Sequence, residues 1–343
     1  MLSRTAEPLS SWTTLHLGGP ARTFVEVADR TELYDTVREL DFRGEPVLVL
    51  GGGSNVVIAD AGFEGTVVRV GTRGVDISDD ACGGVGLTVE AGEDWEALVA
   101  RAVHEEWTGV ESLAGIPGTV GAVPIQNVGA YGQEVADTVA SVHVYDRTER
   151  RTRTFFSADC QFGYRTSLFK QTPGRYVVGG VTFQLRPGSL GAPVGYAELA
   201  RTLGVEVGER APAADVRSAV LTLRAGKGMV LDETDYDTWS AGSFFTNPLV
   251  ARAELPDGAP AWEQPDGRFK TSAAWLIERA GFTKGYGNER ARLSTKHTLA
   301  VTNRGDASTD EVLALAREIR DGVRQKFHVE LLPEPVLVGC SLD

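Results

Sequence analysis

One stretch of the chain, GIPGTVGAVPIQNVGAYGQEVAD at residues 115–137, sets five glycines among small or apolar neighbours. It has no charged side chain before Glu134, so it differs from a solvated linker, which would be polar. Glycine lets a backbone approach a ligand closely and leaves N–H groups bare to bind it. The stretch therefore suits a large, flat, partly anionic cofactor, with Gln126, Asn127 and Tyr131 as its polar groups. The alternative is a tight buried loop between strands.

A second glycine turn, Gly51–Gly53 in VLVLGGGSN, matches a nucleotide-binding loop only in part. A dinucleotide-binding fold needs a third glycine where Val56 stands and then a helix, but only the run VVIAD precedes the next turn. A P-loop is excluded because no Gly-Lys-Ser/Thr follows. What remains is a nest of backbone N–H groups with Ser54 and Asn55, which suits a pyrophosphate, or else a plain turn.

Three further side chains could do chemistry. Arg165 in GYRTS could bind a carboxylate through two parallel hydrogen bonds, or it is a surface arginine at a strand end. Ser243 in GSFFTNP is a weak acid that needs a neighbouring relay to donate a proton, and Gly-Ser before two phenylalanines is more often a turn. Glu334 stands between Pro333 and Pro335, where its carboxylate would be stiffly held and partly desolvated, unless it is an exposed acid starting a strand.

The composition argues against several classes of protein. The formal net charge of −13 disfavours a nucleic-acid surface. No run reaches the roughly 18 apolar residues that span a bilayer, and the first residues lack the apolar core of a secretory signal. Cys82, Cys160 and Cys340 are widely spaced without a CxxC, and the five histidines show no metal-binding spacing. We therefore expect a cytoplasmic monomer that binds neither nucleic acid, nor membrane, nor a structural metal.

The hydrophobic pattern predicts the elements that must position these residues. Strands are expected at residues 23–28, 86–92, 176–185 and 329–339 and in a hairpin over 139–156. Helices are expected at residues 28–40, 93–107, 213–226 and 271–282, and from the capping box Ser308–Glu311 to Phe327. Residues 186–212 are rich in glycine and proline, as in an insertion or connecting segment. Strands and helices intermingle without strict βαβ alternation, which favours an α+β protein of about two domains.

Six motifs, in a fixed order over nearly the whole length, make the chain recognisable: LGGGSNVVIAD, GIPGTVGAVPIQNVGAYG, CQFGYRTSLFK, GSFFTNP, WLIERAGFTKG and LLPEPVLVG. Together they resemble the UDP-N-acetylenolpyruvoylglucosamine reductases, flavoenzymes of peptidoglycan synthesis. The segment around Tyr196 is similar to the subgroup with a tyrosine loop over the substrate. The resemblance implies the FAD-binding fold of the vanillyl-alcohol oxidase and p-cresol methylhydroxylase type, with two subdomains, plus a C-terminal α+β substrate-binding domain.

The domain ranges that the resemblance implies are residues 1–70 and 71–225 for the two FAD-binding subdomains and 226–330 for the substrate-binding domain. Residues 331–343 would form a C-terminal strand that carries Glu334 back to the FAD domain.

Both glycine stretches would then bind FAD, the first at its pyrophosphate and the second along pyrophosphate and isoalloxazine. Non-covalent binding is expected because the sequence has no His or Cys motif for attachment of a flavin. The FAD contacts implied by the resemblance are Gly51, Gly52, Gly53, Ser54, Asn55, Ile116, Pro117, Gly118, Thr119, Gly121, Ala122, Gln126, Asn127, Gly129, Ala130 and Tyr131.

The reaction implied by the resemblance reduces UDP-N-acetylglucosamine enolpyruvate to UDP-N-acetylmuramate. Hydride would pass from NADPH to FAD, then from flavin N5 to the enolpyruvyl β-carbon. Arg165 would stabilise the enolate, Ser243 would protonate the α-carbon, and Glu334 would assist that protonation or hold the enol form. The implied substrate contacts are Tyr164, Tyr196, Lys227, Asn247 and His297. Two of these have ordinary alternatives: Lys227 as a solvated lysine at a helix end, and His297 as a strand histidine with its partners satisfied.

Two other functions stay open at this point. A different FAD oxidoreductase of the same fold, such as an oxidase of alcohols or lactones, would account for both glycine stretches. It would not account for Arg165, Ser243 and Glu334 together in their motifs. A catalytically silent nucleotide-binding module would be expected to have lost these three polar residues, and all three are present.

Overall fold

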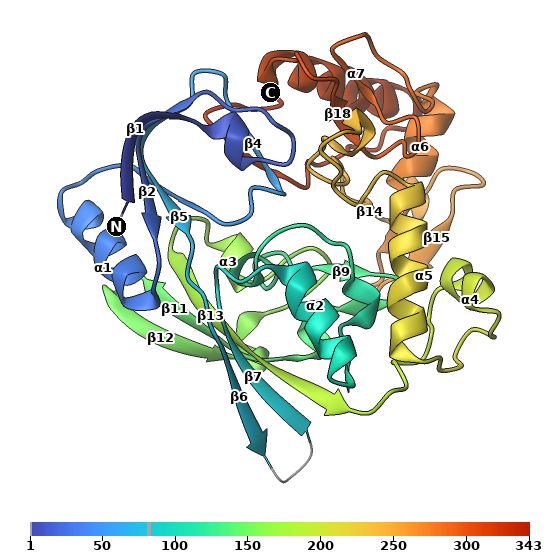
Figure 1. Ribbon diagram of the computed structural model, residues 1–343. Coiled ribbons are helices and arrows are strands. Elements are labelled where there is room, and N and C mark those ends of the chain that lie inside the picture. The colour runs from blue at the N-terminus through green and yellow to red at the C-terminus, as the bar shows by residue number, and fades with distance from the viewer. Residues whose placement is uncertain (1, 81–83) are drawn as a thin grey trace. The chain divides into compact units, whose positions relative to one another are not determined.

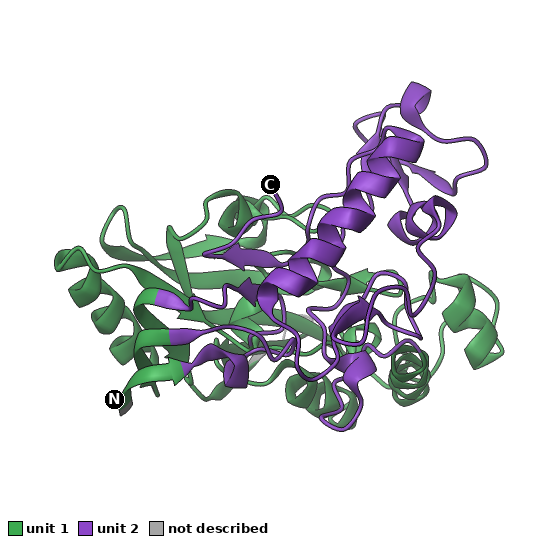
Figure 2. Cartoon of the chain, turned by 90° about the horizontal axis from the view of Figure 1, so that it is seen from above, with its two compact units in different colours: residues 1–7, 21–52, 64–226 green, residues 8–20, 53–63, 227–343 purple. Residues whose placement is uncertain are grey.

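The structure is a computed structural model that describes residues 2–80 and 84–343. The chain forms two compact units, each assembled from segments that are separated in the sequence (Figure 2). Unit 1 comprises residues 1–7, 21–52 and 64–226, and unit 2 comprises residues 8–20, 53–63 and 227–343. Each unit encloses a hydrophobic core of its own. The chain passes into unit 2 after Gly226, beside the expected start of the substrate-binding domain, but the division within the expected FAD domain stays a prediction.

Two sheets form the framework of unit 1 (Figure 1). The first has the strand order β1-β2-β5-β3, and β3 is parallel to β5. Its strands are β1 (Leu2–Pro8), β2 (Pro20–Val27), β3 (Val47–Leu50) and β5 (Phe63–Val70). The second has the order β12-β11-β13-β7-β6, with neighbouring strands antiparallel, and β8 pairs with the far end of β13. Its strands are β6 (Val75–Asp80), β7 (Gly84–Glu90), β8 (Trp107–Thr108), β11 (Val139–Asp146), β12 (Arg151–Phe156) and β13 (Tyr176–Pro187).

The predicted hairpin over residues 139–156 is confirmed as β11 and β12, and the predicted strands at 23–28, 86–92 and 176–185 correspond to β2, β7 and β13. Segments between the strands add shorter elements to unit 1. These are β9 (Gly129–Ala130), β10 (Gln133–Glu134), η2 (Glu111–Leu113), η3 (Val120–Ala122), η4 (Val135–Asp137), η5 (Ser157–Cys160) and α3 (Leu168–Gln171).

Helices α1 (Arg30–Phe42) and α2 (Trp95–His104) each begin after an aspartate N-cap. The Asp29 carboxylate accepts a hydrogen bond from the Glu32 N–H at 2.8 Å, and Asp94 accepts one from the Ala97 N–H at 2.8 Å. Asp29 is therefore the N-cap of α1. Each helix buries an apolar face, formed by Leu33, Val37 and Leu40 in α1 and by Trp95, Leu98, Val99 and Ala102 in α2.

The glycine- and proline-rich segment 186–212 contains a helix that the sequence pattern does not indicate. This helix, α4 (Ala197–Leu203), packs against α5 (Ala213–Gly226), which is the helix predicted to end at Gly226. α4 is only seven residues long, so its apolar repeat covers less than two full turns. Its buried positions are Leu199 and Ala200, too few to mark an amphipathic face in advance.

The core of unit 2 lies between two helices and several short strand pairs. α7 (Thr309–Phe327) begins at the predicted capping box, in which the Ser308 and Glu311 side chains each accept from the other's backbone N–H. The helix predicted over 271–282 is α6 (Ala273–Ala280), and it packs on α7. The strand pairs are β17 (Ala291–Leu293) with β18 (Val301–Asn303), β4 (Val56–Ile58) with β19 (Val336–Val338), and β16 (Phe269–Thr271) between β14 (Leu249–Val250) and β15 (Ala261–Glu263). The remaining turns are η1 (Leu9–Trp12), η6 (Tyr236–Thr238) and η7 (Arg252–Glu254).

The C-terminal strand is shorter than the sequence pattern predicts. Only β19 is a regular strand, whereas residues 329–335 before it are irregular. Pro333 and Pro335 have no N–H to donate to a neighbouring strand, so the ladder cannot continue through them. Among the described residues, no helix has both the length and the apolar character that crossing a bilayer requires.

Candidate active site

The two glycine stretches lie against each other within unit 1. A Cβ atom on Gly52 would be 2.6 Å from the Gly118 Cα, and one on Gly51 would be 2.7 Å from the Thr119 Oγ1. A real Cβ atom does not make contacts this short, so the backbone of Gly118 already requires glycine at position 52, whereas at position 51 the Thr119 side chain would have to shift. The alternative of a tightly packed loop is thus correct for part of the motif. The same contact also brings together the two segments predicted to bind one cofactor.

The first glycine turn also has the geometry of an anion-binding nest. Gly53 has a φ of +64°, and among the described residues the N–H groups of Gly52, Gly53 and Ser54 donate to no protein acceptor. Successive N–H groups left bare around a left-handed residue bind anions such as phosphate. The residues present therefore fit the pyrophosphate of FAD.

The second glycine stretch is supported by its own polar residues. The Asn127 side chain donates to the Glu134 carboxylate at 2.7 Å and to the Gly163 carbonyl at 3.1 Å, and it accepts from the Ala136 N–H at 3.0 Å. Asn127 is only 1% exposed, so these contacts within the protein explain why a polar residue is required there. The FAD contact predicted for Asn127 stays a prediction.

Arg165 lies against this second stretch. Its Nη2 donates to the Gly129 carbonyl at 2.8 Å, and its guanidinium lies 5.4 Å from the centre of the Tyr164 ring. The residue occupies a tight turn closed by reciprocal hydrogen bonds between Gly163 and Thr166, at a left-handed φ of +53°. A non-glycine residue in this region costs free energy, and such residues often occur at functional sites. The predicted carboxylate-binding cation is thus held by local backbone geometry beside the predicted flavin loop.

Tyr196 also reaches the second stretch. Its ring meets the Tyr131 ring edge-on, with centroids 5.7 Å apart, and Gly195 lies opposite Gly132. Tyr196 stands at the N-cap of α4 and is 50% exposed, which is unusual for a large aromatic residue. Unit 1 therefore gathers Arg165, Tyr131 and Tyr196 around residues 129–132.

Sequence reasoning missed Arg224 in this group. Burial lowers the pKa of Arg224 to about 10, and its charge interacts with Tyr131, Glu96 and Arg165. It therefore remains a cation at neutral pH, close to the arginine predicted to bind carboxylate. Its position four residues after the buried Val220 places both on one face of α5, and that spacing could have identified it.

Unit 2 brings together Ser243 and Glu334, which are far apart in the sequence. The Glu334 N–H donates to the carbonyl of Phe244, the residue after Ser243, at 2.9 Å. The contact continues as an antiparallel bridge between Phe245 and Pro333 and as a hydrogen bond from the Thr246 N–H to the Leu332 carbonyl at 3.1 Å. The predicted proton donor and the predicted carboxylate thus stand on adjoining backbone segments of one unit.

Asn55 holds the other side of the Glu334 segment. Its carbonyl accepts from the Val336 N–H at 3.0 Å, and its Nδ2 donates to the Glu334 carbonyl at 3.4 Å. The sequence predicted only an FAD contact for Asn55 itself, so this contact adds a second role to the residue. Asn55 is a predicted FAD contact that also orders the chain around Glu334.

The other predicted substrate contacts have structural surroundings of their own. The Asn247 Oδ1 accepts from the Ala273 N–H at 2.9 Å and so supports the start of α6. Lys227 precedes Gly228, where a Cβ would be 3.5 Å from the Lys296 Cδ. His297 lies in the turn between β17 and β18, not within a strand as the alternative had it. Substrate binding by these three residues stays a prediction.

The cysteines show no sign of a redox or metal role in the part of the chain that the structure describes. Cys160 is buried, and burial and the nearby Asp159 charge raise the pKa of its thiol to about 12. Cys340 is a partly buried free thiol, and Cys82 lies outside the described residues. Residues 2–80 and 84–343 contain no group of three or more His, Cys, Asp or Glu side chains that could hold a metal ion.

Comparisons with known proteins bear on the same regions. Residues 21–154 match the model of an FAD binding domain, and residues 233–338 match the model of the C-terminal domain of UDP-N-acetylenolpyruvoylglucosamine reductase. These matches confirm the predicted fold, an FAD-binding domain followed by a C-terminal domain. They also confirm FAD as the predicted cofactor. The contacts predicted between FAD and individual residues of the glycine stretches stay predictions.

Relatives of similar length carry the same name. The chain is 56% identical to the UDP-N-acetylenolpyruvoylglucosamine reductase of Cutibacterium acnes, with 98% of this chain and 90% of the relative covered. It is 54% identical to that of Thermobifida fusca, with 98% of both covered. The crystal structure of the reductase from Thermus caldophilus superposes with a TM-score of 0.66 at 25% identity, covering 98% of each chain. The chain therefore belongs to the UDP-N-acetylenolpyruvoylglucosamine reductase family, FAD-dependent oxidoreductases of cell-wall synthesis.

Proposed function

We propose that this chain reduces UDP-N-acetylglucosamine enolpyruvate to UDP-N-acetylmuramate with NADPH as the hydride donor. The observation that carries the proposal is the junction of the Ser243 and Glu334 segments by the Glu334 N–H and Phe244 carbonyl, in a member of this family. A reductase of an enol ether must supply a proton as well as a hydride, and this junction joins the backbone segments that carry the Ser243 hydroxyl and the Glu334 carboxylate. FAD, held by the two glycine stretches, would supply the hydride carrier between NADPH and the enolpyruvyl β-carbon.

Arg165 is proposed to stabilise the negative charge that develops during the reaction. Hydride addition to the β-carbon produces an enolate that is delocalised into the pyruvyl carboxylate. A guanidinium can bind both oxygens of that carboxylate and keeps its charge at any working pH. Arg165 is held for this role beside residues 129–132 by its hydrogen bond to the Gly129 carbonyl.

The proton comes from unit 2 in this proposal. Ser243 donates its hydroxyl proton to the α-carbon, and because an ordinary serine is a weak acid it needs a strongly basic acceptor such as a carbanion. Glu334 assists by accepting a hydrogen bond from the hydroxyl or by supporting the enol form. We also propose that Tyr196 and Lys227 bind the sugar and diphosphate, that the protein acts in the cytoplasm, and that it works as a monomer.

Anaerobic spectroscopy of the purified holoenzyme tests the proposal in two steps. NADPH should bleach the yellow flavin absorbance, and addition of the enolpyruvyl substrate should restore it. A flavin that NADPH cannot bleach would remove NADPH as donor. If the enolpyruvyl compound cannot reoxidise the bleached flavin, it is not the substrate of this protein. If only oxygen reoxidises the flavin, the result would favour an oxidase.

The variant Ser243→Ala separates hydride transfer from protonation. Bleaching by NADPH should persist, because the serine has no part in that step. Reoxidation by the substrate should fall by about 100- to 10,000-fold, the range for loss of a general acid. Ser341→Ala, at an exposed serine of the same unit, should change neither rate. Unchanged reoxidation in Ser243→Ala would exclude Ser243 as the proton donor.

A further inference from the structure

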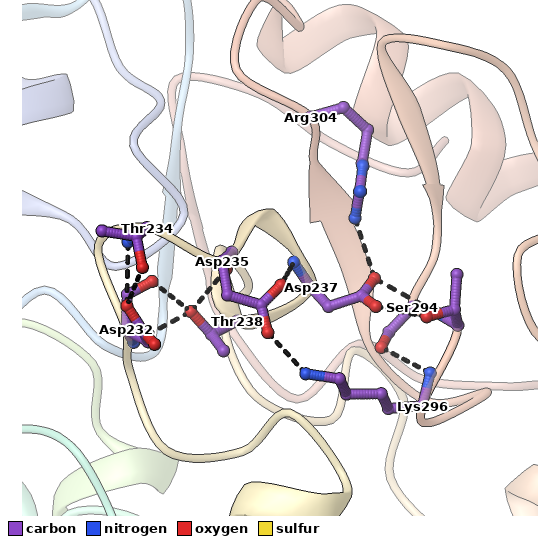
Figure 3. A network of polar contacts seen from close by, with 9 residues as sticks. Asp232, Thr234, Asp235, Asp237, Thr238, Ser294, Lys296 and Arg304 are labelled. Atoms are coloured by element: carbon purple, nitrogen blue, oxygen red, sulfur yellow. Dashed lines mark hydrogen bonds and ion pairs between the residues drawn. The ribbon is translucent and has the colours of Figure 1, made fainter.

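A buried ionic cluster lies just before Ser243 in unit 2, and the proposed mechanism does not use it (Figure 3). At its centre, the Asp237 carboxylate accepts hydrogen bonds from the Arg304 Nη1 at 2.8 Å and from the Thr295 N–H at 3.1 Å. The Thr295 hydroxyl donates to its second oxygen. The Asp237 side chain is 7% exposed, and that of Arg304 is 21% exposed. We call Asp237, Thr295 and Arg304 the Asp237 cluster.

A second ion pair extends this cluster toward the start of the segment. Asp235 accepts from the Lys296 ammonium and, through its other oxygen, from the Asp237 N–H at 2.9 Å. The hydrogen bond from Lys296 lowers the pKa of Asp235, and the same bond raises the pKa of Lys296. The charges therefore occur in matched pairs, and each carboxylate already has a cation. Such a cluster fixes backbone segments instead of offering an open site for a metal.

The cluster joins the segment that leads to Ser243 with the turn between β17 and β18. Beyond Asp237, the Trp239 carbonyl accepts from the Asn303 N–H at 3.0 Å, and Ser240 forms a bridge with Thr302. The Thr14 hydroxyl donates to the Ser240 carbonyl at 2.8 Å. Residues 239–240, immediately before the Ser243 loop, are thus attached to β18.

The far side of the Ser243 loop is attached to the same turn. The Phe244 N–H donates to the Leu299 carbonyl at 2.7 Å, and Leu299 belongs to the turn that begins with Thr295. The loop over residues 241–243 therefore spans two attachments to one β17–β18 hairpin. Asp237 is the buried charged residue that connects the segment before the loop to this turn. A shift of the turn against that segment would move Ser243 relative to Phe244 and hence to Glu334.

We propose that Asp237 is a positioning residue for Ser243 in the reduction described above. This inference rests on the proposed function, because it assigns Asp237 an effect only on the step in which Ser243 protonates the α-carbon of the substrate. Asp237 acts through backbone segments and does not contact the reacting atoms. It sets the position of the Ser243 hydroxyl, whereas hydride transfer from NADPH to the flavin is independent of it.

Asp237→Asn tests this role in the full-length holoenzyme. The amide keeps the shape of the side chain but removes the charge that pairs with Arg304, which is costly at a buried site. Bleaching by NADPH should stay within twofold of wild type, and bound FAD should be unchanged. Reoxidation by the enolpyruvyl substrate should slow by about 10- to 100-fold, as for a displacement of about an ångström near a reacting atom. The substrate concentration that gives half the maximal reoxidation rate should change little.

Three comparisons make the result specific. Asp266→Asn breaks an exposed pair with Arg268 in the same unit and should leave both half-reactions unchanged. Thr295→Val removes one donor to Asp237 while keeping the side-chain shape and should slow reoxidation by a smaller factor, about threefold. In heavy water, Asp237→Asn should show a larger solvent isotope effect on reoxidation than wild type, because proton transfer becomes the slower step.

The two half-reactions distinguish failure of the positioning role of Asp237 from failure of the proposed function. If the substrate does not reoxidise the bleached wild type, the function fails and this inference fails with it. If wild type is active but Asp237→Asn slows both half-reactions equally, or neither, the positioning role is overturned. If Asp237→Asn does not fold, Thr295→Val decides the question by the same two rates.

Discussion

Arg165 and Tyr196 both lie against one contiguous stretch of unit 1, residues 129–132. In unit 2, by contrast, the segments that carry Ser243 and Glu334 are joined by backbone contacts between distant parts of the sequence. In unit 1, the glycines and a single tight turn set the geometry. In unit 2, Thr14, Asn55 and the β17–β18 turn each hold part of the same region by hydrogen bonds. The first arrangement depends on backbone conformation over short spans. The second depends on long-range contacts, and a change at a distant residue should therefore disturb it.

The largest expected effect is at the local site. Arg165→Met removes the proposed carboxylate-binding cation, and reoxidation by the enolpyruvyl substrate should fall by about 100- to 1000-fold, the loss expected for one group that stabilises developing charge. Bleaching by NADPH should persist. Arg165→Lys keeps a charge at the same left-handed backbone position but cannot bind two oxygens at once, so it should recover only part of the rate.

Stopped-flow measurement of both half-reactions checks these expectations. Arg38→Met, at an exposed arginine of α1, serves as the control and should behave as wild type. Equal activity of Arg165→Met and wild type would show that Arg165 is not the cation that stabilises the enolate. The proposed division of roles, with the carboxylate-binding Arg165 in unit 1 and the proton donor in unit 2, would then be wrong.

The next effect concerns stability in acid. Asp146 is fully buried in unit 1, and although burial opposes its charge, hydrogen bonds from Arg175, Arg153 and the Glu149 N–H lower its pKa to about 2. A carboxyl whose pKa is lower in the folded than in the unfolded chain stabilises the fold above its ordinary pKa, near 4, and that contribution disappears as the pH falls toward 2. Asp146→Asn should cost about 3 kcal/mol at neutral pH, as for breaking a buried ion pair.

Urea unfolding at a series of pH values measures this contribution. Wild type should lose stability between about pH 4 and pH 2, and Asp146→Asn should lose less over the same range because its amide does not titrate. Parallel curves for the two proteins would contradict the assignment to Asp146. Because Asp146 lies on β11 with Arg175 before β13, the effect reports on the sheet of unit 1.

Features that depend on residues close together in the sequence could be predicted from it, whereas features that depend on long-range contacts could not. The caps at Asp29 and Asp94, the Ser308–Glu311 box and the 139–156 hairpin were all predictable, because each depends on residues a few positions apart. The contact of Gly52 with Gly118 could be suspected from composition, since both loops lack side chains.

The junction of Ser243 with Glu334 could be reached only through the family resemblance. No periodicity links Phe244 to Glu334, and the two prolines around Glu334 interrupt the strand that the pattern predicts. Asp237 was missed because burial of a charge depends on what packs against it, and that information lies in the fold. For Arg224, the four-residue spacing from the buried Val220 on α5 was a local signal that could have been used.

A smaller effect tests the contact between the glycine stretches. Gly52→Ala introduces a Cβ that would lie 2.6 Å from the Gly118 Cα, so the two loops must separate. The free energy of unfolding should fall by about 1–3 kcal/mol, as for other overpacked sites, and FAD should bind more weakly. Gly226→Ala is the control, because a Cβ there meets nothing within 4 Å. Thermal melts with and without added FAD give both quantities, and a Gly52→Ala protein as stable as wild type would contradict the close packing.

The smallest expected effect concerns Asn55, which is a predicted FAD contact and also hydrogen-bonds to the Glu334 segment. Asn55→Ala removes the Nδ2 that donates to the Glu334 carbonyl but leaves the Asn55 carbonyl, which still accepts from the Val336 N–H. If the residue mainly orders the Glu334 segment, FAD affinity should stay near wild type while reoxidation by the substrate slows by about tenfold, equivalent to about 1.4 kcal/mol. If it mainly binds FAD, the affinity should fall first and saturating FAD should restore the rate. Titration with FAD followed by single-turnover reoxidation distinguishes the two, because only a defect in the ordering of Glu334 persists at full occupancy of the flavin site.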